Sequence, residues 1–202
     1  MNRNMVILQN GSELILINPV RMDEQGLAAL DALGTVRHIM RLGDFHGLDD
    51  AFFLDRYRCL FWAQSGQETY KQPSPTNEIG PDTVSPFPNS KFFIFQTAKY
   101  PEAALLVKDH KLLITTDSVQ YHPDWSYFSG LSKVVFKLLG FKTGINIGPP
   151  WIKRVTPKGG SLKGDFERLV NLDFDAIVAA HGLPLQLDAK KQLQSEIDSV
   201  FG

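Results

Sequence analysis

The chain has 202 residues, of which 43% are hydrophobic and 21% charged, a composition that excludes disordered, collagen-like and coiled-coil proteins. Its net charge of -1 gives no overall positive field for nucleic acid or an anionic membrane, so we expect neither partner. The single cysteine, Cys59, cannot form an intramolecular disulfide, and no apolar run is long enough to span a bilayer. We therefore expect one cytoplasmic domain over residues 1–202.

The N-terminal part predicts a β-hairpin, then helices that alternate with strands. The hairpin turn is Asn10-Gly11, a dipeptide that tolerates positive φ at both central positions. Leu27 and Leu30 lie at helical spacing before Gly34, which favours a helix end. The expected elements are strands 5–9 and 13–18, helix 23–33, strand 36–42, helix 49–57 and strand 59–63.

Residues 64–90 differ in composition from the rest of the chain. They are rich in Ser, Gln, Asn and Gly, and five prolines exclude any long regular element. We interpret this segment as an excursion from the domain that forms a lid or a contact in a homo-oligomer.

The remainder predicts a mixture of strands and helices. The expected elements are strands 91–96, 103–108 and 111–116, helices 125–139 and 161–172, strand 175–180 and helix 188–201. Hairpins at the start and interleaved helices later favour an α/β domain in which helices cover the faces of a sheet.

Ionisable side chains follow three of the predicted strands. They are His46, Asp49 and Asp50 after the strand 36–42, Asp117 after the strand 111–116, and His181 after the strand 175–180. Ligands of α/β proteins gather at the carboxyl ends of strands, so these side chains are expected to converge. Imidazole and carboxylate together suit Zn, Fe or Mn. The sequence therefore predicts a metal site.

Three short motifs resemble those of the metallo-β-lactamase fold superfamily of metal-dependent hydrolases. They are His46-Gly-Leu-Asp-Asp50, where that family has His-x-His-x-Asp-His, Thr116-Asp117-Ser118 at its bridging aspartate, and Ala180-His181-Gly182 at its last histidine. The resemblance covers most of the chain. It implies a four-layer αββα sandwich of metallo-β-lactamase type with mixed sheets, and a metal site at one edge of the sandwich.

The resemblance also implies an incomplete set of metal ligands. Leu48 and Ala51 stand where the family has its second and third histidines, and residues 97–102 lack the histidine expected before the bridging aspartate. The remaining candidates are His46, Asp50, Asp117 and His181, with Asp49 as a substitute for Asp50. We therefore expect one divalent metal, Zn or else Fe or Mn, or no metal at all.

The function implied by the resemblance is hydrolysis of a small-molecule ester, amide or phosphoester by a metal-activated water. Asp50 or Asp117 would orient the water, and His122 would carry a proton or support a ligand. The alternative is a non-catalytic ligand-binding or structural relative that has lost its metal centre.

Several of these residues also have simple structural interpretations. Asp49 and Asp50 lie where carboxylates commonly stabilise a helix N-terminus, and His181 suits a histidine that bonds loop carbonyls. Basic residues in the segment 153–163 precede a helix at Ser161 and suggest an anion site. A solvated loop with Ser161 as an ordinary helix cap is the simpler interpretation of that segment.

Overall fold

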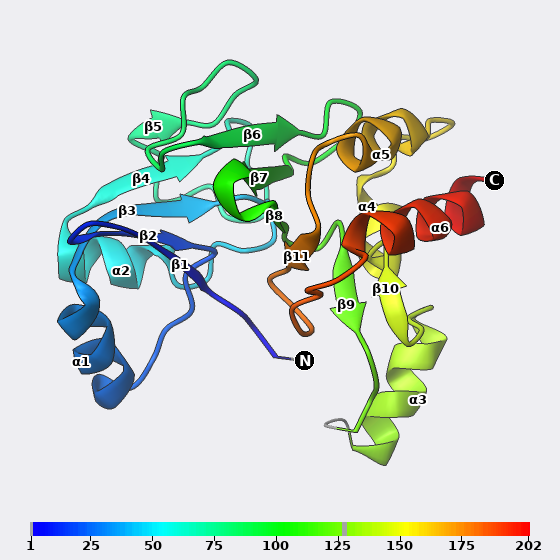
Figure 1. Cartoon of the computed structure of the whole chain (residues 1–202), viewed down its shortest axis with the longest axis horizontal. Helices are drawn as coiled ribbons and strands as arrows, with labels where there is room; N and C mark the ends of the chain where they lie inside the picture. The colour runs from blue at the N-terminus through cyan, green and yellow to red at the C-terminus, as the bar shows by residue number, and fades with distance from the viewer. Residues whose placement is uncertain (1, 127–128) are drawn as a thin grey trace.

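The computed structural model describes residues 2–126 and 129–202 and contains two main sheets in the interior of the molecule (Figure 1). The first sheet has the strand order β1-β2-β3-β4-β5. Its strands are β1 Val6–Asn10, β2 Glu13–Ile17, β3 Thr35–Arg41, β4 Leu60–Ala63 and β5 Asn77–Glu78. β1 and β2 form the antiparallel hairpin, and the other neighbouring strands pair in parallel.

The second sheet has the strand order β11-β8-β7-β6 and is also mixed. Its strands are β6 Ser90–Ile94, β7 Ala103–Val107, β8 Leu112–Ile114 and β11 Ala176–Val178. β11 pairs with β8 in parallel, so both strands end at the same edge. A separate antiparallel pair joins β9 Gln120–His122 to β10 Gly144–Asn146.

The two sheets pack face to face because their strands alternate between two apolar surfaces. In β2, Ile15 and Ile17 face the second sheet, whereas Leu14 and Leu16 belong to the cluster under the helices. β7 is buried along its whole length, as expected for a strand covered on both faces.

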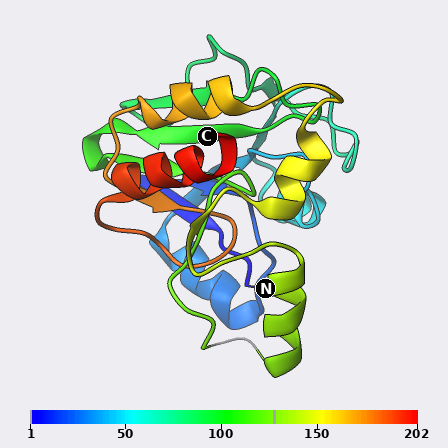
Figure 2. The ribbon, with the colours of Figure 1, turned by 90° about the vertical axis from the view of Figure 1, so that its right-hand side faces the viewer.

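Helices cover the outer face of each sheet (Figures 1 and 2). α1 Glu24–Leu33 and α2 Asp50–Tyr57 pack on the first sheet. α4 Pro149–Val155, α5 Lys163–Val170 and α6 Ala189–Phe201 pack on the second. α3 Gly130–Leu138 projects away from these layers in both views. The arrangement is the αββα sandwich that the sequence predicts.

Within the part of the chain that the structure describes, three strands and one α-helix were not predicted from the sequence. β5, β9 and β10 contain only two or three residues each, too few to show an apolar period. α4 begins at Pro149-Pro150, where the sequence predicts no regular element, although proline is well suited to the first turn of a helix.

The predicted helix 125–139 is shorter in the structure. α3 begins at Gly130 after its N-cap Ser129, whose side chain accepts a hydrogen bond from the backbone N–H of Ser132. The part of the prediction at residues 127–128 lies outside the described residues.

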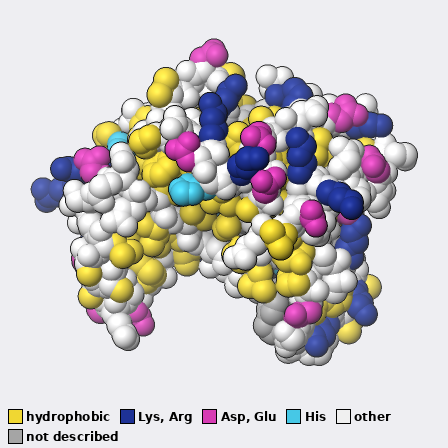
Figure 3. All heavy atoms as spheres, viewed as in Figure 1, with side chains coloured by type: hydrophobic (Ala, Val, Ile, Leu, Met, Phe, Trp, Pro, Cys, Tyr) yellow, Lys and Arg dark blue, Asp and Glu magenta, His cyan; other side chains and the backbone are white. Residues whose placement is uncertain are grey.

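Within residues 2–126 and 129–202, no helix combines the length and apolar character needed to cross a bilayer. On the face drawn in Figure 3 the molecule is hollowed between the parts that contain α1 and α3, and hydrophobic side chains gather on both sides of the hollow.

Candidate metal centre

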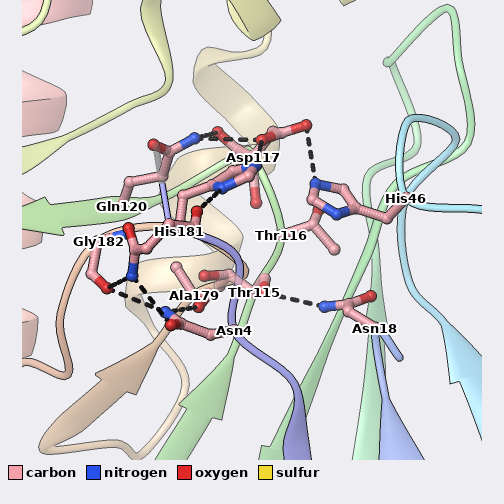
Figure 4. A network of polar contacts seen from close by, with 12 residues as sticks. Asn4, Asn18, His46, Thr115, Thr116, Asp117, Gln120, Ala179, His181 and Gly182 are labelled. Carbon is pink, nitrogen blue, oxygen red and sulfur yellow. Dashed lines mark hydrogen bonds and ion pairs between the residues drawn. The ribbon is translucent and has the colours of Figure 1, made fainter. Parts of the chain in front are cut away.

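Three side chains from distant parts of the sequence meet at one edge of the sandwich (Figure 4). His46, Asp117 and His181 each offer one ligand atom, and these atoms all lie within 4.8 Å of one another. Nε2 of His46 is 3.1 Å from Oδ2 of Asp117, and Nε2 of His181 is 3.4 Å from Oδ1. The carboxylate therefore lies between the two imidazoles.

The position of His181 depends on the residue that follows it and on the N-terminal segment. Gly182 has φ +82°, and a Cβ there would lie 2.2 Å from the carbonyl oxygen of Tyr121, so glycine is required. Nδ1 of His181 is 2.6 Å from the carbonyl oxygen of Asn2. A proton on Nδ1 leaves the lone pair of Nε2 facing Asp117, which is the arrangement typical of a metal-binding histidine.

His46 lies in the turn after β3 and is 6% exposed. Its backbone N–H donates to the carbonyl oxygen of Gly43, and its ring centroid is 5.1 Å from that of His181. The turn begins where β3 ends, so the rigid strand determines where the imidazole lies.

Asp117 lies in the short connection between β8 and β9. Its Oδ1 accepts a hydrogen bond of 3.2 Å from Nε2 of Gln120. Burial acts to raise the pKa of Asp117, but the hydrogen bond and charge of His46, together with the charge of His181, hold this pKa below its usual range. The carboxylate is thus ionised and available as a ligand.

A fully buried carboxyl group, Glu102, supports the connection that carries Asp117. Its Oε1 accepts hydrogen bonds from the hydroxyl of Thr116 and, at 3.2 Å, from the backbone N–H of Ser118. Burial, with the nearby charge of Asp117, raises the pKa of Glu102 to about 8. At neutral pH the group is therefore mainly protonated, and it fixes the residues on both sides of Asp117 without adding a second full charge.

Asp49 and Asp50, the other two candidates from the sequence, lie outside the three-residue group. Oδ2 of Asp49 is 2.7 Å from Nη1 of Arg3. Asp50 is fully buried at the start of α2, with Oδ2 3.2 Å from Nη1 of the equally buried Arg41. Burial raises the pKa of Asp50 to about 6, although Arg41 acts to lower it. Asp49 is thus hydrogen-bonded to Arg3, and Asp50 is charge-paired with Arg41, although neither oxygen of Asp50 has a hydrogen-bond partner among the described residues.

His122 is linked to the site through Gln120, and it also lies close enough to His181 for their charges to interact. Its Nε2 is 3.2 Å from Oε1 of Gln120, whose amide nitrogen donates to Asp117. Burial lowers the pKa of His122 and favours the neutral ring. The geometry suits a role in orienting the Gln120 amide better than a role as a proton carrier.

Sequence reasoning missed Arg41, Glu102 and Gln120. Arg41 and Glu102 each left a signal, because each is a charged residue next to an apolar run that forms a buried strand. Such a charge requires a partner in the interior. Gln120 shows no comparable pattern in the sequence, because its role depends on the turn after Asp117, which brings its side chain back to the carboxylate.

The residues present fit a single divalent ion. Two imidazole nitrogens and a carboxylate oxygen are the protein ligands of many catalytic zinc sites, with distances of about 2.0–2.2 Å to the ion. Small movements of side chains already grouped within 4.8 Å would satisfy these distances. His181 also has the second hydrogen bond that such a ligand normally makes.

Comparison with solved structures agrees with this architecture. VMB-1 superposes with a TM-score of 0.67 at 13% identity, covering 99% of this chain and 86% of that chain. A chemotaxis sensor described as ODP with a peroxy-diiron species gives a TM-score of 0.66 at 11% identity, covering 100% and 87%. The metallo-β-lactamase FIM-1 from Pseudomonas aeruginosa, in a mono-zinc form, gives a TM-score of 0.64 at 9% identity, covering 98% of this chain and 84% of that chain.

No family model and no curated protein matches the sequence. The identities to the solved structures are low, so the likeness concerns the fold. The chain has the metallo-β-lactamase fold, as the sequence motifs predict. His46, Asp117 and His181 lie together in that fold, and Asp49 and Asp50 lie outside their group.

Proposed function

We propose that this protein is a hydrolase that uses one divalent metal ion held by His46, Asp117 and His181. The observation that carries the proposal is the convergence of their ligand atoms within 4.8 Å. Two imidazoles and one carboxylate suit zinc, and the same set also suits iron or manganese. Three protein ligands leave a coordination position for water or substrate.

Two features favour one ion over two. Leu48 and Ala51 offer no lone pair where the resembling family has histidines. The nearby Asp50 is neutralised by the buried guanidinium of Arg41, so its charge is already balanced within the protein. A second ion would have too few ligands.

The chemistry follows from the residues around the open position. When bound, the ion would supply Lewis acidity and lower the pKa of a water ligand. Asp117 contributes negative charge that partly offsets the ion, and Gln120 holds the carboxylate in place. His122 orients Gln120 through the contact between its Nε2 and Oε1 of Gln120. This arrangement suits hydrolysis of an ester, amide or phosphoester in a small molecule.

The test is turnover by the metal-loaded protein. Protein purified without chelator is reconstituted separately with zinc, iron and manganese, and each form is assayed on chromogenic esters, amides and phosphoesters. We expect hydrolysis of at least one class, and its loss in His46→Ala and His181→Ala. His110→Ala is the matched control, because His110 is exposed in the 3₁₀ turn Lys108–His110 and should leave turnover unchanged.

Two results would contradict the proposal, and the first of them would support the non-catalytic alternative. A protein that binds metal at these residues but hydrolyses none of the three classes in any metal form would contradict the hydrolase proposal. Turnover that survives in both alanine variants would show that the reaction takes place elsewhere.

A further inference from the structure

The candidate metal centre borders an apolar cavity of about 310 Å³. This volume falls within the range of about 300–1,000 Å³ that is typical of small-molecule sites. Most of the wall is apolar and much of it aromatic, and the remaining lining residues are polar or charged. The lining residues include Phe45, Leu139, Asp117, Gln120 and Arg154.

The cavity and the metal centre share residues. Asp117 lines the cavity and is one of the three metal-ligand candidates. Gln120, which donates to Asp117, lines it as well, and Phe45 is the residue before His46. A molecule in the cavity therefore has one end beside the proposed reaction site.

Arg154 supplies the positive charge of the cavity. Its guanidinium carbon lies 4.4 Å from the ring centroid of Phe45 and 5.6 Å from that of Tyr100. Among the residues that the structure describes, no carboxylate lies at ion-pair distance from Arg154. Stacking on the aromatic rings orients the guanidinium, and its N–H groups match the geometry of a carboxylate.

The charges also orient a ligand within the cavity. In the metal-free protein, the carboxylate of Asp117 lines the cavity and would repel a second negative charge beside it. An anionic group is therefore favoured at Arg154, and an uncharged part of the molecule, such as a carbonyl group, is favoured beside Asp117.

We propose that this cavity binds the apolar body of a small carboxylic acid that is the substrate, with Arg154 binding the carboxylate. The assignment as substrate rests on the proposed function, because the bond to be hydrolysed lies beside the metal centre. Recognition of an apolar carboxylate does not depend on metal or on turnover, so it is tested separately.

The first test measures the binding of small molecules to the metal-free protein by ¹H–¹⁵N NMR titration. The probes are 4-phenylbutyrate, the uncharged 4-phenylbutan-1-ol and acetate, which lacks the apolar body. We expect 4-phenylbutyrate to bind most tightly. Arg154→Ala should weaken its binding about 10- to 100-fold without changing that of the alcohol. Lys153→Ala is the control, because this exposed neighbour on α4 does not line the cavity.

The second test fills the cavity. Leu139→Trp places a larger side chain on a wall residue that is 42% exposed, so the fold should tolerate it, and binding of both phenyl probes should be lost. Leu138→Trp, at a position 80% exposed and outside the cavity, should bind both probes normally.

The proposal is overturned if 4-phenylbutyrate binds no better than acetate, or if the paired variants at 153 and 154, or at 138 and 139, behave alike. Specific binding of 4-phenylbutyrate without any turnover would leave this inference standing and contradict the hydrolase proposal alone. Turnover without specific binding of 4-phenylbutyrate would support the hydrolase proposal and contradict this inference.

Discussion

At the residue scale, Glu102 shows how a buried acid can serve a metal site without binding metal. Its carboxyl group holds Thr116 and Ser118, the two neighbours of Asp117. Gly43 faces the same group so closely that a Cβ would lie 2.4 Å from Oε2 of Glu102. The space around the carboxyl is filled, so its position is fixed.

The raised pKa of Glu102 predicts a dependence of stability on pH. Its pKa is near 4.5 when exposed and about 8 in the folded chain, so folding favours the protonated form. The stabilisation is complete below pH 4.5 and is lost as pH rises toward 8, by at most about 1.4 kcal/mol per pH unit. Glu102→Gln keeps the acceptor and should flatten this slope. Urea unfolding between pH 5 and 8 measures it.

Glu167→Gln is the control for this measurement, because Glu167 is exposed on α5. Its slope should equal that of the unmodified chain. If Glu102→Gln shows that same slope, Glu102 is not the titrating group.

The sequence predicted some residues of the candidate site and not others, for a physical reason. His46, Asp117 and His181 stand in short motifs after predicted strands, and ligands of α/β proteins gather at the carboxyl ends of strands. Asp50 lies outside their group and pairs with Arg41, which is at the end of a strand nine residues earlier. Pairings between buried charges depend on how strands face helices, and no local pattern shows that.

At the scale of elements, α5 is joined to the end of β6 by a carboxylate. Asp165, in the first turn of α5, accepts hydrogen bonds from the backbone N–H groups of Gln96 at 3.1 Å and Thr97 at 2.9 Å. It also accepts from the hydroxyl of Thr97 at 2.5 Å and contacts Arg168. Asp165 thus helps to fix the helix on its sheet, together with Arg168, whose Nη2 donates to the carbonyl oxygen of Ile94 at 3.0 Å.

Removing this carboxylate should destabilise the fold. We expect Asp165→Ala to lower the free energy of unfolding by about 3 kcal/mol, because buried donors lose a charged acceptor. Burial acts to raise the pKa of Asp165, but the bonds from Thr97 hold it below its usual range. The stabilisation is therefore present above pH 4 and is lost as pH falls further.

Denaturant unfolding at pH 7 and pH 3 measures both effects. Glu167→Ala on the exposed side of the same helix should change the free energy by less than about 0.5 kcal/mol. Equal losses in the two variants would contradict the role given to Asp165.

Elements with a strong apolar period were predictable, and short ones were not. The prediction of a helix over 188–201 agrees with α6, and that of a strand over 103–108 agrees with β7. β9 and β10 form by pairing with each other over three residues. Neither segment shows a pattern of its own that would predict a strand. The excursion at 64–90 contains the short strand β5, which adds to the edge of the first sheet.

At the scale of the whole molecule, the N-terminal segment closes the site from the other end of the sequence. The side-chain Nδ2 of Asn4 donates to the carbonyl oxygens of Ala179 and Gly182 (Figure 4). The side-chain Nδ2 of Asn2 also donates to the carbonyl oxygen of Gly182. The carbonyl oxygen of Asn2 lies against Nδ1 of His181. Contacts across almost the whole chain thus orient one metal-ligand candidate.

Deleting residues 2–4 should weaken metal binding without unfolding the sandwich. Loss of a supporting hydrogen bond to a ligand typically lowers metal affinity about 10- to 100-fold. Competition with a chromogenic zinc chelator measures the affinity, and circular dichroism checks the fold. Asn2→Ala is the matched variant, because it keeps the backbone carbonyl and should retain most of the affinity. A deletion that binds zinc as tightly as the full chain would show that His181 needs no such support.

We propose above that His46, Asp117 and His181 form a site for one metal ion. Calorimetric titration of metal-free protein with zinc tests this most directly. We expect one ion per chain, with binding abolished in His46→Ala, Asp117→Ala and His181→Ala and retained in Asp50→Asn. Two ions per chain, no binding, or binding that depends on Asp50 as strongly as on Asp117 would contradict it.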